Sequence, residues 1–205
     1  MALKKATQQD VIEREKFDNL DEAVEFFENS TELEDKSYAL NQMALFEGGY
    51  QKIAEILQHE EDHSLIDIIG AILSKVDGEV APIDEILTLL KRENPYVRNL
   101  AISVLQTYGD AIKYYIVKYL IGEDRDLRIF AINVLGDVKF ASSRDMLVEL
   151  LESEEDVNVA MTAVDYLGEI GQEEDIALLE SLKERFPDEF YVSFAVDGAI
   201  NAIKG

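Results

Sequence analysis

Apolar residues recur along this chain with the spacing of capped, amphipathic α-helices. A new block opens every 30 or 32 residues with a polar side chain that can accept hydrogen bonds from a first helical turn, at Asp62, Asn94, Asp124, Asp156 and Asp188. Apolar residues follow three, seven and eleven positions later, as Val97, Ala101 and Leu105 do after Asn94. This spacing predicts an α-helix of about four turns in each block.

A second amphipathic segment follows each capped segment after a short break. These second segments cover residues 82–92, 110–121, 142–152 and 173–186. A single pair of such helices cannot bury both apolar faces, so the hydrophobic effect drives each pair onto its neighbours. The pattern therefore predicts an all-α stack of helical hairpins that lengthens in one direction.

Three stretches carry a resemblance to a known family. They are NPYVRNLAISVLQTYGD at 94–110, DRDLRIFAINVLGDV at 124–138 and DVNVAMTAVDYLGEIG at 156–171. The chain resembles the HEAT repeats over residues 60–205, and is most similar to the short HEAT-like repeats of phycobilisome lyases. This resemblance implies a right-handed α-α superhelix of about five hairpins. Upstream, Asp35 is expected to open one degenerate repeat.

The resemblance also implies a role for two arginines. The family usually carries Asp at the cap and Arg four residues later, and these residues form a ladder between repeats. Arg98 and Arg128 match that arginine. The resemblance thus predicts that Arg98 meets Asp124 and that Arg128 meets Asp156, which favours a structural role over ligand binding.

The chain is expected to form one continuous unit. Residues 1–30 are predicted to be a helical cap for the first hairpin, and residues 31–205 to be the HEAT-like solenoid. Residues 191–203 supply a first helix without a second one to follow it. Either this is a single closing helix, or the C-terminal edge docks a partner, so a monomer or a weak dimer through that edge is expected.

Composition narrows the functional classes. The chain has 43 acidic and 19 basic residues, a net charge of −24 at pH 7, and no cysteine. Nucleic-acid affinity depends on contacts between cations and phosphates, so no nucleic-acid partner is expected. Thiolate chemistry is excluded, and neither a signal peptide nor a membrane span is evident, which predicts a cytoplasmic protein without a membrane partner or cofactor.

One second segment, DAIKYYIVKYL, suggests a binding surface. Its expected buried face consists of Ile112, Tyr115, Ile116, Tyr119 and Leu120. Tyr114, Val117 and Lys118 are left pointing outward, and the resemblance places them on the concave side, near Lys91 and Arg144. Tyrosine is favoured at interfaces, so these five residues are the candidate protein-binding site. The alternative is that the rings fill core and the lysines are only solvated.

A string that looks like a zinc motif does not carry that chemistry. His59, Glu60 and His63 match the H-E-x-x-H pattern, which needs both histidines on one helix. Asp62 is the expected cap of the next helix, so the histidines should straddle a bend. They are also the only two histidines in the chain, too few for the repeated His-Glu pairs of deoxyhypusine hydroxylase.

Three functions are left by these observations. A non-catalytic scaffold or adaptor that binds another protein is favoured, because repeat stacks present long surfaces and no catalytic cluster is visible. A bilin lyase-like or chaperone subunit that assists pigment attachment is suggested by the resemblance alone. A nucleic-acid enzyme of the DNA glycosylase kind is opposed by the acidic charge.

Overall fold

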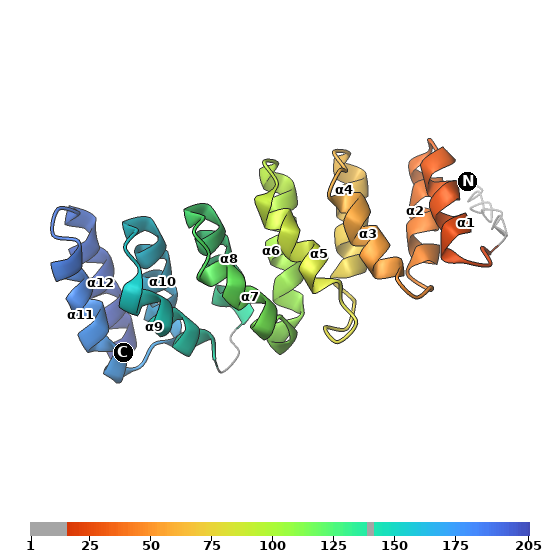
Figure 1. Cartoon of the computed structure of the whole chain (residues 1–205). Coiled ribbons are helices and arrows are strands. Elements are labelled where there is room, and N and C mark those ends of the chain that lie inside the picture. The colour runs from red at the N-terminus through yellow and green to blue at the C-terminus, as the bar shows by residue number, and fades with distance from the viewer. Residues whose placement is uncertain (1–15, 139–141) are drawn as a thin grey trace, which may run out of the picture.

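The computed structural model describes residues 16–138 and 142–205, and every regular element in this part of the chain is helical. The helices form one elongated row (Figure 1). In chain order they are α1 (Leu20–Asn29), α2 (Leu33–Met43), α3 (Gly49–Leu57), α4 (His63–Leu73), α5 (Ile83–Thr88), α6 (Pro95–Thr107), α7 (Lys113–Leu120), α8 (Arg125–Val138), α9 (Ser143–Ser153), α10 (Val157–Ile170), α11 (Ile176–Arg185) and α12 (Phe190–Lys204). The predicted all-α solenoid is confirmed.

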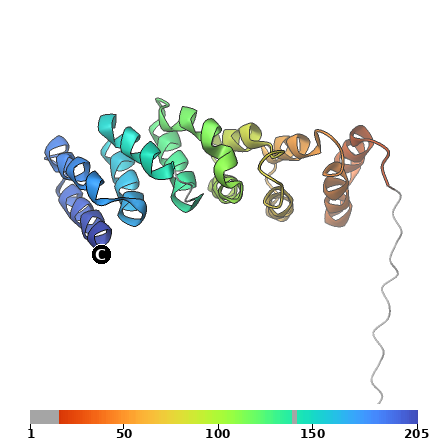
Figure 2. The same ribbon diagram turned by 90° about the horizontal axis from the view of Figure 1, so that it is seen from below.

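The helices alternate between two layers. Layer A contains α2, α4, α6, α8, α10 and α12, and each of these helices contacts the next one in the layer. Layer B contains α1, α3, α5, α7, α9 and α11, and each of these packs on the layer A helix that follows it in the chain. Figure 2 shows the two layers from below as two rows. A continuous apolar core runs between the layers along the whole row.

The predicted apolar positions form this core in the four central repeats, although Leu127 of α8 is only partly buried. Val97, Ala101 and Leu105 of α6 are fully buried, and the matching residues of α4 and α10 are buried as well. Burial of each Val, Leu or Ile side chain contributes about 1.5–3 kcal/mol. The pattern weakens in α12, where Tyr191 and Ala195 are only partly buried.

Four of the predicted caps begin their helices as expected. The side chains of Asp62, Asn94, Asp124 and Asp156 each accept a hydrogen bond from a backbone N–H two residues later, at 2.8–3.0 Å. Pro95 occupies the first position of α6, where its missing N–H has no cost. These caps satisfy amide groups that the first helical turn leaves without partners.

Two predicted caps are wrong. Helix α12 begins at Phe190, one residue later than the pattern places it, and Glu189 precedes it without a side-chain cap. Helix α2 begins at Leu33, so Asp35 lies inside its first turn rather than before it. In both cases the stack determines where the helix starts, because packing of an apolar face outweighs about 1 kcal/mol from a cap.

Both ends of the stack differ from the middle. Helix α1 packs on α2, whereas residues 1–15 of the predicted cap lie outside the described residues. The division into a cap at 1–30 and a solenoid at 31–205 stays a prediction. Helix α12, expected to lack a partner, packs against both α10 and α11. Within the described part of the chain, none of the helices combines the length and apolar character that crossing a bilayer requires.

Candidate functional site

A strip of apolar side chains faces solvent along α7. Tyr114 is 85% exposed and Val117 is 38% exposed, and Ile121, just beyond the helix, is 77% exposed. These residues are spaced three and four positions apart, so they share one face of the helix. Ile112, Ile116 and the rest of the opposite face are buried as expected, except that Tyr115 is partly exposed.

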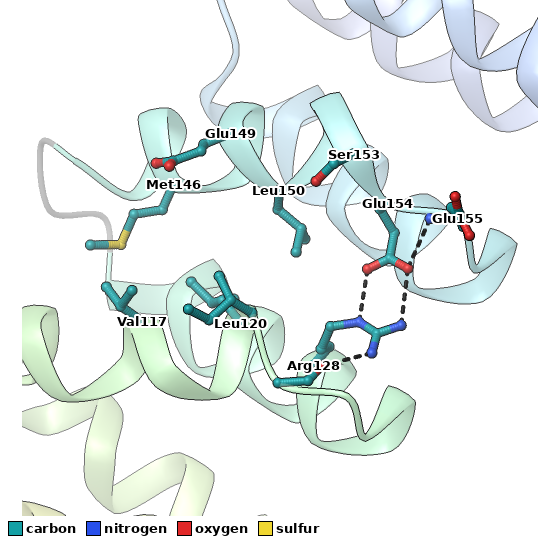
Figure 3. Close-up of a pocket in the computed structure, with 11 residues that line it drawn as sticks. Val117, Leu120, Arg128, Met146, Glu149, Leu150, Ser153, Glu154 and Glu155 are labelled. Carbon is teal, nitrogen blue, oxygen red and sulfur yellow. Dashed lines mark hydrogen bonds and ion pairs between the residues drawn. The ribbon is translucent and has the colours of Figure 1, made fainter.

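The strip borders a groove where layer B opens. Within layer B, α3 contacts α5, α5 contacts α7 and α9 contacts α11, whereas α7 and α9 barely contact each other. Between them lies a cavity of about 430 Å³. Its apolar lining consists of Val117, Leu120 and Ile121 from the α7 side and Met146 and Leu150 from α9. Figure 3 shows Val117 and Met146 on opposite walls of this groove, which we call the α7–α9 groove.

An ion pair closes one end of the α7–α9 groove. The Nε and Nη2 atoms of Arg128 donate to the two carboxylate oxygens of Glu154 at 2.8 and 3.0 Å (Figure 3). Arg128 also donates through Nη1 to the carbonyls of Gly122 and Glu123, at 2.9 and 3.0 Å. The arginine therefore ties the end of α7 to the start of α10 and uses four of its five N–H groups for bonds within the protein.

The prediction that Arg128 pairs with Asp156 is wrong. Asp156 uses its carboxylate to cap α10, accepting from the backbone N–H of Asn158 at 2.9 Å and of Val159 at 3.2 Å. Glu154, two residues earlier, is buried and also accepts from the N–H of Asp156 at 2.8 Å. The predicted structural role of Arg128 holds, with Glu154 as the partner.

Arg98 also differs from the expected ladder. Its Nη1 donates to the carbonyls of Arg92 and Glu93, at 2.6 and 2.9 Å, and its guanidinium lies 5.0 Å from the ring centre of Phe130. Asp124 caps α8 instead of pairing with this arginine. Arg98 thus joins α6 to α8 through a cation–π contact rather than through a carboxylate.

The rim of the α7–α9 groove is acidic. Arg128 is the cation among the residues that line it, and Glu154 neutralises this charge. Glu149 and Glu155 line the same groove and are exposed to solvent. Helices α7 and α9 both end beside it, so their C-terminal carbonyls add partial negative charge. The groove therefore combines an apolar floor with a negative rim.

Lys118 of α7 and Lys91, which follows α5 in the chain, lie together away from the α7–α9 groove. They line a separate cavity of about 380 Å³ together with Tyr119. The Nζ atom of Lys118 donates to Asp84 of α5 at 2.6 Å, and this hydrogen bond raises the pKa of Lys118 above its ordinary value. Both side chains are more than half exposed, so the pair is worth less than about 1 kcal/mol.

Arg144 ties two helices together. Its Nε and Nη2 atoms donate to both carboxylate oxygens of Asp175 at 2.8 and 2.6 Å, and Nη2 also reaches Glu174 at 2.5 Å. These hydrogen bonds raise the pKa of Arg144, with Asp175 as the main cause. The structure does not bring the five predicted residues into one groove. Val117 lines the α7–α9 groove and Tyr114 lies on the same face of α7, whereas Lys91 and Lys118 line the other cavity and Arg144 is held by Asp175. Their role in protein binding stays a prediction.

The two histidines straddle a bend, as predicted. His59 follows α3, Asp62 caps α4, and His63 begins α4. The ring of His63 stacks on that of Tyr96 at 4.4 Å between centres, and the Tyr96 hydroxyl donates to Asp67. Within residues 16–138 and 142–205, no three His, Cys, Asp or Glu side chains lie together as a metal site would need.

Sequence reasoning missed most of the groove. Ile121, Met146, Glu149 and Leu150 were not among the predicted site residues, although each lines it. One signal was available: the interval from Asn94 to Asp124 is 30 residues, whereas the neighbouring intervals are 32. The shorter repeat contains α7, which has 8 residues against 11 in α9.

Comparisons with known proteins agree with this architecture. An all-α stack of this kind is an α-solenoid. Residues 115–190 match the family described as HEAT repeats, which confirms the resemblance for this part of the chain. A search of curated proteins found no match.

Several known structures resemble this chain at low identity and low TM-score. A designed armadillo repeat protein in complex with the peptide (KR)4 has 16% identity and a TM-score of 0.43, over 90% of this chain and 99% of that one. A homology model of the full-length AP-3 complex has 16% identity and a TM-score of 0.47, over 90% of this chain and 37% of that one. The complex of CpcE and CpcF of phycocyanin lyase from Nostoc sp. PCC7120 has 13% identity and a TM-score of 0.38, over 97% and 100%. At these values the likenesses carry no argument about function.

Proposed function

We propose that this protein is a non-catalytic scaffold that binds another protein through the α7–α9 groove and the adjoining strip of α7. The observation that carries the proposal is the opening of layer B between two helices that leave Val117, Ile121 and Met146 at a solvent-accessible groove. Elsewhere in layer B, apart from α1, each helix contacts the next helix in the layer.

Exposed apolar side chains beside the groove would stabilise a complex when a partner covers them. Covering an exposed aliphatic or aromatic side chain contributes about 1.5–3 kcal/mol when burial is complete. Tyr114 and Ile121 are largely exposed and Val117 partly so, and they lie beside a concave surface. Apolar patches of this kind next to polar rims are typical of protein interaction sites.

The test places a photoreactive side chain in the groove. A cross-linking amino acid at Met146 should capture a partner from the source cell extract, and the substitutions Val117→Asp and Ile121→Asp in the same chain should abolish this capture. Leu45→Asp is the matched control, because Leu45 is an exposed apolar residue just beyond α2, toward the N-terminal end of the stack. Equal capture by the wild-type and groove variants, with circular dichroism unchanged, would refute the proposal.

A weak dimer through the C-terminal edge is a second proposal about partners. Phe190 and Phe194 are 91% and 85% exposed on one face of α12, and a methyl group at Gly198 would meet no atom within 4 Å. These features support close approach of another helix. Sedimentation velocity at increasing concentration should show dimerisation that Phe194→Ser removes; a purely monomeric wild-type chain at high concentration would contradict it.

The other functions have less support. The net charge of −24 opposes binding to phosphate backbones, and failure to shift a DNA duplex at low salt would exclude a nucleic-acid enzyme. Assistance in pigment attachment rests on similarity of repeat type alone. A change in visible absorbance on adding a bilin would support it.

A further inference from the structure

We infer that the occupant of the α7–α9 groove is a short amphipathic helix with lysine or arginine on its flanks. This inference rests on the proposed function and adds the chemistry of the partner. It follows from the shape of the opening in layer B, from the positions of its apolar residues and from the charges that remain unneutralised around it.

The shape of the opening fits a helix. Its walls are α7, with 8 residues, and α9, with 11 residues, which correspond to lengths of about 12 and 16 Å. A partner helix of about three turns matches this length. It would lie along the groove, over the side chains of α7 and α9 that line it.

The apolar lining matches one face of such a helix. Val117 and Leu120 on one wall and Met146 and Leu150 on the other contribute side chains one helical turn apart. Apolar residues at positions i, i+3 or i+4, and i+7 of a partner would alternate between these walls, as in other helix-in-groove complexes. Methionine adapts its shape to different partners, which suits Met146 to this role.

The charge of the groove selects a cationic partner. Arg128 is neutralised by Glu154, so the free charges in the lining are those of Glu149 and Glu155. The C-terminal ends of α7 and α9 reinforce this negative potential. Lysine or arginine beside the apolar face of a partner would meet these carboxylates, whereas acidic flanks would be repelled.

The experiment compares three fluorescent peptides of about 16 residues, each mixed with the full chain. The first has Leu on one helical face and Lys on its flanks, the second replaces every Lys by Glu, and the third scrambles the first so that no apolar face forms. Fluorescence anisotropy should show the first peptide binding at least about tenfold more tightly than either of the others.

Two variants separate the groove from general attraction to an acidic protein. Glu149→Gln with Glu155→Gln should weaken binding of the Lys peptide about threefold to tenfold at low salt. Asp21→Asn with Glu25→Gln removes two exposed charges from α1, at the other end of the stack, and should leave binding within about twofold. Val117→Asp should abolish binding by placing a charge in the apolar floor.

The outcomes distinguish a cationic helix in the groove from a partner of other charge and from nonspecific attraction. Tight binding of the Lys peptide that both groove variants weaken supports the inference. Equal binding of the Glu peptide, lost in Val117→Asp, would overturn the inference about charge but leave the groove as a protein-binding site. Equal binding of the scrambled peptide, unchanged in every variant, would show nonspecific attraction and overturn the inference. Failure of all three peptides would also overturn it, whereas the cross-linking experiment tests the groove independently.

Discussion

The ion pair between Arg128 and Glu154 gives the sharpest stability prediction. Glu154→Ala removes a carboxylate that accepts from Arg128 and from the N–H groups of Glu155 and Asp156. The side chains of Arg128 and Glu154 are only 15% and 6% exposed, so the arginine would keep a poorly solvated, unpaired charge. Removing one partner of a buried pair costs about 3–5 kcal/mol. We expect about 3 kcal/mol, because Arg128 retains two carbonyl partners.

The corresponding fall in melting temperature is about 6–12 °C, at about 2–4 °C per kcal/mol for a chain of this size. Circular dichroism during thermal and urea unfolding measures it. Arg125→Ala is the control, since Arg125 forms an exposed pair with Asp126 and should change stability by less than about 1 kcal/mol. The double change Arg128→Met with Glu154→Leu should recover part of the loss. Equal effects of Glu154→Ala and Arg125→Ala would refute the reasoning.

Three further substitutions test close packing and a buried hydroxyl. Gly49→Ala should destabilise the protein by about 1–3 kcal/mol in urea unfolding, because its new carbon would lie 1.8 Å from the carbonyl oxygen of Met43. Gly198→Ala meets nothing within 4 Å and should stabilise α12 by about 0.5–1 kcal/mol; the same sign for both glycines would contradict this account. Tyr108→Phe should cost about 1 kcal/mol, because the buried Tyr108 hydroxyl donates to the carbonyl of Leu73 at 2.9 Å. Burial raises the pKa of Tyr108, so its contribution to the free energy of unfolding is complete below about pH 10 and is lost as pH rises further. The free energy of unfolding of Tyr108→Phe should therefore fall less steeply with pH above about pH 10 than that of the wild type. The same pH dependence in both proteins would argue against this.

Local spacing was sufficient to predict the helices and most of the core. Val97, Ala101 and Leu105 follow directly from a helical period behind a cap, and they are buried because both layers need that face. The caps at Asp62, Asn94, Asp124 and Asp156 were predictable for the same reason, since each depends only on atoms within three residues.

Contacts between repeats were harder to predict. A regular ladder assigned Asp156 to Arg128, but Asp156 was already occupied by its own helix and Glu154 had the free carboxylate. Arg144 read as an exposed cation, although Asp175 lies 31 residues away in sequence and within hydrogen-bond distance in space. Neither pairing has a local sequence signature, because both depend on the offset between neighbouring hairpins.

The difference in packing between the two layers gives the molecule a preferred direction of bending. Layer A is continuous, and a methyl group added at Gly168 would lie 3.3 Å from the backbone of Ala199, so α10 and α12 leave little room for sliding. Layer B is interrupted between α7 and α9. Flexing about the layer A spine therefore changes the α7-to-α9 spacing more than the α8-to-α10 spacing. A partner bound between α7 and α9 would therefore restrict bending of the solenoid and fix the distance between its two ends.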